Sequence, residues 1–155
     1  MLVLGDFSTS VRRALSEIDP KWEDYEGLVI CGTHAPQDVE HEINEIRDAR
    51  ENKIPFLGIC HGHQLTAVEY ARNVRGIADA CSQEWGKGTY VVKKLPELKV
   101  GLHNGESYWH NYEVSIRWEN PPHFFTAQFH PEYQSSKDKP HPLLVSFLKY
   151  AKMAM

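Results

Sequence analysis

The sequence predicts an α/β fold, specifically a three-layer α/β/α sandwich with a mostly parallel central sheet. Short apolar runs typical of buried strands alternate along the chain with segments typical of helices. One run, residues 54–59, leads directly into a cysteine flanked by glycines and then into a helix, which is the layout of a nucleophile elbow. The 155 residues are enough for one domain with a substantial core, so we expect a single domain over 1–155.

The first half of the chain supplies most of the predicted strands and helices. In order, we expect a strand over 2–4, a helix over 11–18, a strand over 27–31, a loop over 32–36, a helix over 37–52, a strand over 54–59 and a helix over 61–74. Ser8 or Ser10 could cap the first helix, and Asp19 and Pro20 would end it. The helix over 37–52 has apolar residues at helical spacing, at positions 39, 43 and 46.

The second half is richer in β-structure and less regular. Residues 88–93 and 112–116 alternate between apolar and polar side chains, and 124–129 form a last apolar strand. A closing helix is expected over 141–153, with its apolar face at positions 143, 144, 147 and 148. Only one strand precedes residue 27, so we expect a small sheet.

Composition and charge exclude several classes of function. A net charge of −4 gives no reason to expect binding to nucleic acid or to an anionic membrane surface. No apolar run approaches the roughly 20 residues of a membrane span, and the first residues do not resemble a signal peptide. Three irregularly spaced cysteines do not suggest a disulfide framework. We therefore expect a cytoplasmic protein.

Cys60 is the candidate nucleophile. Gly58 and Gly62 allow the backbone to turn sharply around it, and the following helix directs its N-terminal amides toward the sulfur. His130 and Glu132 lie far downstream and supply the imidazole and carboxylate that a cysteine nucleophile needs. A free cysteine is often a buried structural thiol, and we interpret Cys31 and Cys81 in that way.

Several segments, in the same order along the chain, resemble the class I glutamine amidotransferases, or triad-type glutaminases. They are similar above all to the glutaminase domain of CTP synthases. The segments that carry the resemblance are residues 47–74, 86–89, 110–114, 124–133 and 141–143. The resemblance extends from about residue 25 onward and implies the flavodoxin-like fold of that family.

The resemblance also implies roles for individual residues. Cys60 would attack the side-chain amide of glutamine, His130 would be the general base, and Glu132 would orient His130. Candidate substrate-binding residues are Gly32, His61, Gly62, His63, Gln64, Glu84, Asn111 and Tyr112. The expected ligand is a small amide, glutamine or an analogue, with no cofactor. The family's synthetase domain has no counterpart here, which suggests a separate synthetase-like partner chain.

The sequence departs from the family in the pocket. The loop after the second strand retains one glycine, Gly32, where the family is Gly-Gly rich. His61 and His63 replace apolar residues, and Asn111 stands where the family has arginine. Losing one oxyanion donor typically costs on the order of 10²–10³ in rate. Two explanations remain open: hydrolysis of a different amide, or weakened catalysis in a module kept for binding.

The histidines raise a third hypothesis, a zinc site. His34, His110 and His130 could converge on Cys60, together with His61 or His63. However, side chains two residues apart at the start of a helix point about 200° apart. The sequence also contains no paired ligand motif, so we expect no metal.

Overall fold

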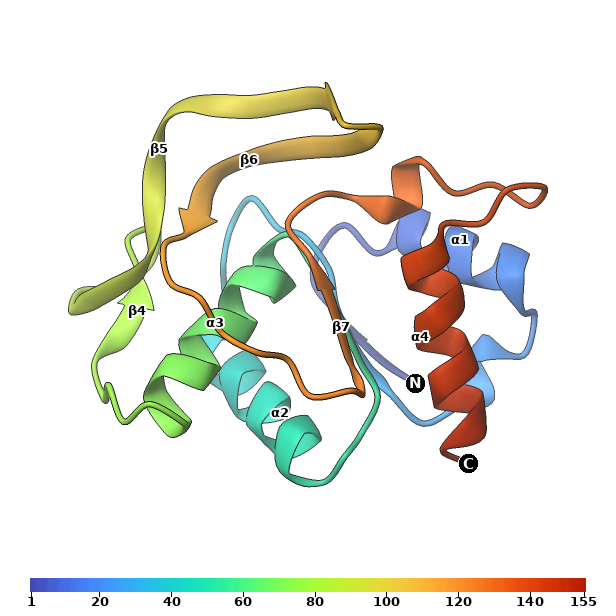
Figure 1. Cartoon of the computed structure of the whole chain (residues 1–155), viewed down its shortest axis with the longest axis horizontal. Coiled ribbons are helices and arrows are strands. Elements are labelled where there is room, and N and C mark those ends of the chain that lie inside the picture. The colour runs from blue at the N-terminus through green and yellow to red at the C-terminus, as the bar shows by residue number, and fades with distance from the viewer.

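The computed structural model describes residues 1–155 and has a four-stranded parallel sheet at its centre (Figure 1). The strand order is β1-β2-β3-β7, and every neighbouring pair is parallel. The strands are β1 Leu2–Leu4, β2 Leu28–Ile30, β3 Phe56–Ile59 and β7 Phe124–Ala127. The predicted α/β class with a parallel sheet is confirmed, and the sheet is small, as expected.

Helices cover both faces of this sheet and complete the three layers (Figure 1). One face packs against α1 Thr9–Ile18 and α4 Pro142–Met153, and the other against α2 Val39–Glu51 and α3 His61–Asn73. Strand β2 is fully buried and serves both cores: Val29 packs toward α1 and α4, whereas Leu28 and Ile30 pack toward α2 and α3. Burial on both faces explains why the central strands are apolar runs without alternation.

Gly62 allows α3 to lie directly on β2. A Cβ at this position would be 2.3 Å from the carbonyl oxygen of Ile30. No side chain larger than hydrogen fits in that space, so Gly62 sets the close approach of the helix that follows Cys60. Farther along, α2 and α3 are joined by the Arg50 guanidinium, which donates to both carboxylate oxygens of the fully buried Glu69 at 2.8 and 3.0 Å.

A second sheet, in the order β4-β5-β6, forms a long arm over the carboxyl ends of the central strands (Figure 1). Its strands are β4 Ala80–Ser82, β5 Thr89–His103 and β6 Glu106–Val114. The antiparallel pair β5–β6 is closed by Asn104 and Gly105, both with positive φ (54° and 79°), as a tight hairpin turn requires. The sequence-based strands over 88–93 and 112–116 cover only the base of this arm.

Most predicted helix boundaries agree with the structure within two or three residues. Helix α1 begins at Thr9, and the side chain of Ser8 makes no capping hydrogen bond. Helix α2 begins at Val39 because Asp38 is in the left-handed conformation (φ 51°). Helix α4 is capped by a side chain that we did not predict: the His141 ring accepts a hydrogen bond from the Leu143 N–H at 3.1 Å.

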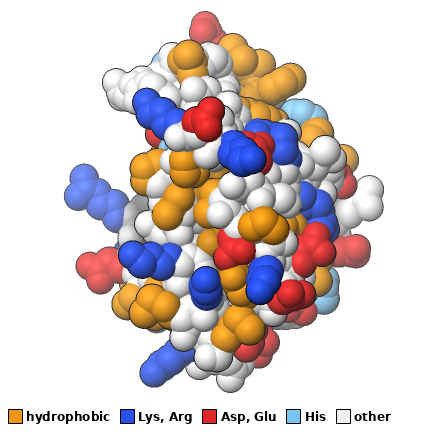
Figure 2. Space-filling model, turned by 90° about the vertical axis from the view of Figure 1, so that its right-hand side faces the viewer, with side chains coloured by type: hydrophobic (Ala, Val, Ile, Leu, Met, Phe, Trp, Pro, Cys, Tyr) orange, Lys and Arg blue, Asp and Glu red, His pale blue; other side chains and the backbone are white.

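Two short 3₁₀ helices, η1 Trp22–Asp24 and η2 Pro131–Tyr133, complete the fold. Figure 2 shows one side of the molecule, where Lys and Arg side chains are interspersed with Asp and Glu rather than gathered by sign. None of the helices has the length and apolar character needed to cross a membrane.

Candidate active site

Cys60 occupies a strained turn between β3 and α3. Its backbone has φ 55° and ψ −100°, and its N–H donates to the carbonyl of Ala127 at 2.8 Å. A non-glycine residue with positive φ is uncommon, and such strain clusters at functional sites. The turn places the sulfur beyond the end of the sheet, above the N-terminus of α3, with the residue 8% exposed. The elbow layout expected from the sequence is therefore present.

His130 and Glu132 form a buried pair just beyond the end of β7. The His130 Nδ1 lies 3.2 Å from Glu132 Oε2, and the two residues are 5% and 1% exposed. The backbone on both sides is anchored, because the His130 N–H donates to the Ser107 carbonyl at 2.7 Å and Arg13 donates to the Glu132 carbonyl at 2.9 Å. The ring of Tyr133 stacks on the imidazole, with centroids 5.0 Å apart. His130 is thus held in a defined orientation.

The electrostatics of this pair favour a protonated imidazole. Burial alone opposes protonation of His130, but its interactions with Cys60 and Glu132 outweigh burial and raise its pKa to about 10. Gly32 lies against both His130 and Cys60, since a Cβ at Gly32 would be 3.2 Å from His130 Cε1 and 3.7 Å from Cys60 Cβ. The structure therefore brings together all three candidate catalytic residues.

Two further groups contact the sulfur. The Gln128 side chain donates to Cys60 Sγ at 3.5 Å, and the carbonyl of Trp109 lies 3.8 Å from the same atom. The N–H of His61 is the first of helix α3 and has no acceptor within the helix. The Gly32 N–H makes no backbone hydrogen bond. The N–H groups of Gly32 and His61 are thus free donors close to Cys60.

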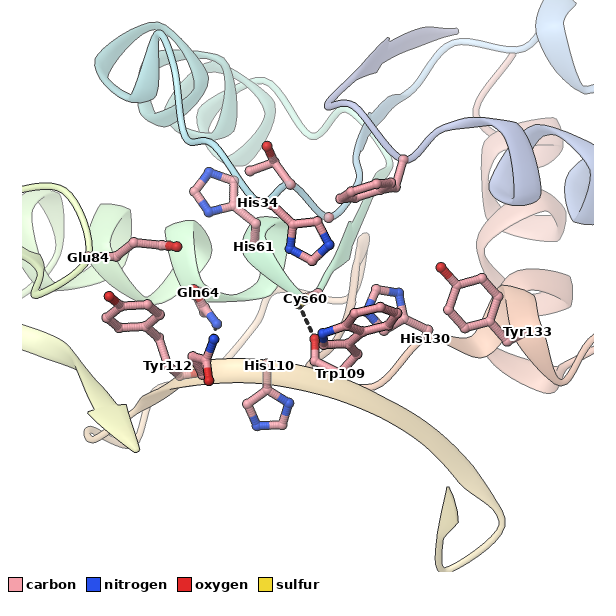
Figure 3. Close-up of a pocket in the computed structure, with 14 residues that line it drawn as sticks. His34, Cys60, His61, Gln64, Glu84, Trp109, His110, Tyr112, His130 and Tyr133 are labelled. Atoms are coloured by element: carbon pink, nitrogen blue, oxygen red, sulfur yellow. Dashed lines mark hydrogen bonds between the residues drawn. The ribbon is translucent and has the colours of Figure 1, made fainter. Parts of the chain in front are cut away.

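A cavity of about 220 Å³ opens beside Cys60 (Figure 3). It is smaller than the roughly 300–1,000 Å³ of pockets for drug-sized ligands and suits a smaller molecule. Its lining residues are Phe7, Gly32, Thr33, His34, Cys60, His61, Gln64, Glu84, Trp109, His110, Asn111, Tyr112, His130 and Tyr133. Six of the eight expected substrate-binding residues belong to this lining.

The other two expected residues, Gly62 and His63, lie outside it. Gly62 faces β2, where it makes the close contact with Ile30 described above. His63 is on the far side of the α3 N-terminus, where its Nδ1 is 3.1 Å from Thr126 Oγ1 and its ring packs on Trp118. Burial lowers the pKa of His63 to about 4. Successive helical side chains point in different directions, so His61 and His63 do not share one pocket.

Phe7 lines the cavity but was not predicted from the sequence, and neither was the contact of Gln128 with Cys60. Phe7, His34 and Trp109 form an aromatic edge, with ring centroids 4.6 Å apart for the first pair and 5.5 Å for the second. Phe7 arrives from the loop after β1, for which no motif gave a signal. Gln128 could have been found, since it lies two residues before His130 at the end of a predicted strand.

The zinc hypothesis finds no support in the arrangement of the side chains. No group of three or more His, Cys, Asp or Glu residues is placed to hold a metal ion. His61 and His110 both line the cavity, but neither belongs to such a group. Their ring nitrogens are buried and have no hydrogen-bond partner in the protein.

Comparisons with known proteins give a consistent assignment. The family model for glutamine amidotransferase class-I matches residues 6–120. Similar curated proteins include the CTP synthases of Methanoregula boonei and Methanospirillum hungatei. Each is 32% identical to the chain, over 82% and 89% of its residues, and the matches cover 34% and 38% of those enzymes. The chain thus spans about a third of the length of these relatives.

Among solved structures, the Trypanosoma brucei CTPS glutaminase domain with bound acivicin is similar in fold. It has a TM-score of 0.78 and 19% identity, and the match covers 99% of this chain and 94% of that one. Together with the family match over residues 6–120, this leads to one conclusion: the chain belongs to the class I glutamine amidotransferase family.

Proposed function

We propose that this protein is a cysteine-dependent amidohydrolase that hydrolyses the side-chain amide of glutamine, or of a closely related compound, through a thioester on Cys60. The main support is the position of Cys60 at a strained elbow, beside a buried His130–Glu132 pair and at the edge of a small cavity. Family membership points to the same reaction.

In the proposed first step, the sulfur of Cys60 attacks the amide carbon. A carbon–sulfur bond forms, the electron pair of the C=O bond moves to oxygen, and the carbon–nitrogen bond then breaks. With a pKa of about 10, His130 carries its proton at neutral pH. An imidazolium beside a cysteine favours the reactive thiolate. His130 then acts first as the acid, giving its proton to the departing ammonia.

In the second step, the neutral His130 accepts a proton from water, and the resulting hydroxide adds to the thioester. The carbon–sulfur bond breaks, the sulfur leaves as thiolate beside the reprotonated His130, and the γ-carboxylic acid is released and gives its proton to solvent. Glu132 would stabilise the imidazolium and fix the ring. The backbone N–H of His61, with that of Gly32, would stabilise the oxyanion in both steps.

A second candidate is a binding or regulatory module with weak or no catalysis, acting with a separate synthetase-like chain. The loop after β2 favours this alternative, because its side chains restrict it: Thr33 Oγ1 donates to Asp6 at 2.6 Å and accepts from the Ala35 N–H at 3.1 Å. A loop fixed in this way has less freedom to turn its own backbone N–H group toward the oxyanion.

Two measurements on the isolated protein separate these candidates. The first is ammonia release from glutamine, with Cys60→Ala as the control. The second is alkylation by a glutamine-mimicking electrophile, followed by mass spectrometry of each cysteine. Cys31 and Cys81 are internal controls, since burial raises the pKa of both thiols, that of Cys31 to about 12. Rapid labelling confined to Cys60 and blocked by glutamine supports the enzyme, whereas equal labelling of all three cysteines contradicts it.

A further inference from the structure

The cavity lining contains an unpaired acidic side chain but no unpaired basic one. No lysine or arginine lines it. The lining carboxylate is Glu84, which is half-buried and has no ion-pair partner, and burial raises its pKa. The one lining cation is the imidazolium of His130, and that group is already paired with Glu132. A ligand's ammonium group would therefore find a counterion, and a ligand's carboxylate would not.

The remaining polar groups of the lining are neutral. His61 is 3% exposed, and neither of its ring nitrogens has a hydrogen-bond partner in the protein. Burial lowers its pKa to about 4, so the ring is uncharged at neutral pH. A neutral imidazole and the Asn111 amide can donate hydrogen bonds to a carbonyl oxygen, but they supply no charge to offset a desolvated carboxylate.

The mouth of the cavity offers an apolar surface rather than a charged one. Phe7, Trp109 and Tyr133 are 38%, 51% and 46% exposed, and His34 lies between Phe7 and Trp109. All four line the cavity, and in Figure 3 the rings of His34 and Trp109 lie near Cys60 whereas the ring of Tyr133 lies farther out, beyond His130. Exposed aromatic rings at a pocket entrance are suited to contact a substituent that extends out of the cavity.

Building on the proposed function, we propose that the substrate is a glutamine derivative with a free α-amine and a masked α-carboxyl group, as in a glutamine residue at the N-terminus of a peptide. Glu84 binds the ammonium group, and the neutral donors bind the carbonyl oxygen of the masked carboxyl. The group attached to that carbonyl lies over the aromatic residues at the mouth. The same hydrolysis at the side-chain amide then releases ammonia.

The test compares kcat/KM for ammonia release from L-glutamine, from its tert-butyl ester, and from the N-acetylated ester. We expect the ester to exceed glutamine by about tenfold or more, because the free carboxylate of glutamine would lose its water in the cavity without gaining a counterion. N-acetylation removes the charge that Glu84 would bind and should cancel most of this gain. Blanks with Cys60→Ala correct for spontaneous hydrolysis.

A charge-restoring variant gives a second readout. Asn111→Arg places a cation in the lining and should move the ester-to-glutamine ratio at least about tenfold toward glutamine. Ser115→Arg is the matched control: it adds the same charge to an exposed position just beyond β6 and outside the lining, and should leave the ratio unchanged.

The outcomes separate this inference from the function on which it rests. A wild-type protein that prefers glutamine to its ester, or treats them equally, would overturn the inference and leave the amidohydrolase intact. A ratio that moves equally in both arginine variants would also overturn it. No ammonia from any of the three compounds would overturn the proposed function and this inference together.

Discussion

Replacing Glu132 by glutamine tests how His130 keeps its proton. The substitution preserves shape but removes the negative charge 3.2 Å from His130 Nδ1. The other carboxylate oxygen, Oε1, has no hydrogen-bond partner, so no second contact is lost. An opposite charge at this distance typically shifts a pKa by about 1–3 units. We therefore expect the pKa of His130 to fall from about 10 to roughly 7–9.

The same shift has a consequence for stability. The folded-state pKa of His130 lies above its ordinary value of 6.5. Protonation of this ring therefore stabilises the fold fully below about pH 6.5, and this contribution is lost as the pH rises toward 10. In Glu132→Gln the total contribution is smaller, and it is lost over a lower pH range.

NMR titration of the His130 ring measures the pKa directly, and the alkaline limb of kcat/KM for ammonia release should move with it. Glu45→Gln is the matched control, since it removes an equivalent carboxylate beside His41 on the exposed surface of α2. An His130 pKa that stays within about half a unit of the wild-type value in Glu132→Gln would refute this account of the pair.

Three substitutions test the framework around the site. Gly62→Ala, whose Cβ would be 2.3 Å from the Ile30 carbonyl oxygen, should destabilise the fold by about 1–3 kcal/mol or more, and a melting temperature equal to wild type would contradict this packing. Arg50→Met leaves the buried carboxylate of Glu69 unpaired and should cost about 3–5 kcal/mol in chemical denaturation; a loss below about 1 kcal/mol would show that the pair is unimportant. Gly32→Ala adds a methyl group 3.2 Å from Cε1 of His130 and should lower kcat about tenfold or more with little loss of stability, so unchanged turnover would argue against this contact.

The sequence was sufficient for the central sheet and its helices because their signals are local. Apolar runs buried on both faces, and helices with one apolar stripe, can be recognised within a window of about ten residues. The elbow at Cys60 was also recognisable, because a strand, a glycine-flanked cysteine and a helix follow one another without a gap. The motif around His130 and Glu132 added the second half of the site.

The arm formed by β5 and β6 was predicted only at its base. Its distal part has apolar residues that alternate, Leu98, Val100 and Leu102, but these are 43–66% exposed and pack against no core. The turn was not predicted, although Asn104-Gly105 is a strong short signal for a hairpin. Without the arm, the position of the Trp109 ring over the cavity could not be derived.

His63 illustrates a different limit of sequence reasoning. It neighbours the elbow in sequence, which suggested a role in the pocket, but the direction of a helical side chain depends on how the helix is docked. The contact of Gly62 with β2 fixes the rotation of α3 and turns His63 toward Thr126. Such a rotation depends on tertiary packing, which no local pattern encodes.

The arm is one continuous stretch of chain, residues 89–114, and belongs to a sheet separate from the one that carries the elbow. One wall of the cavity can therefore be varied through the side chains of this one segment, provided that its backbone is kept, because the Ser107 carbonyl accepts the hydrogen bond that anchors His130. Side-chain libraries confined to the arm would vary the shape and polarity of the cavity while the parallel sheet and the elbow at Cys60 keep their sequence.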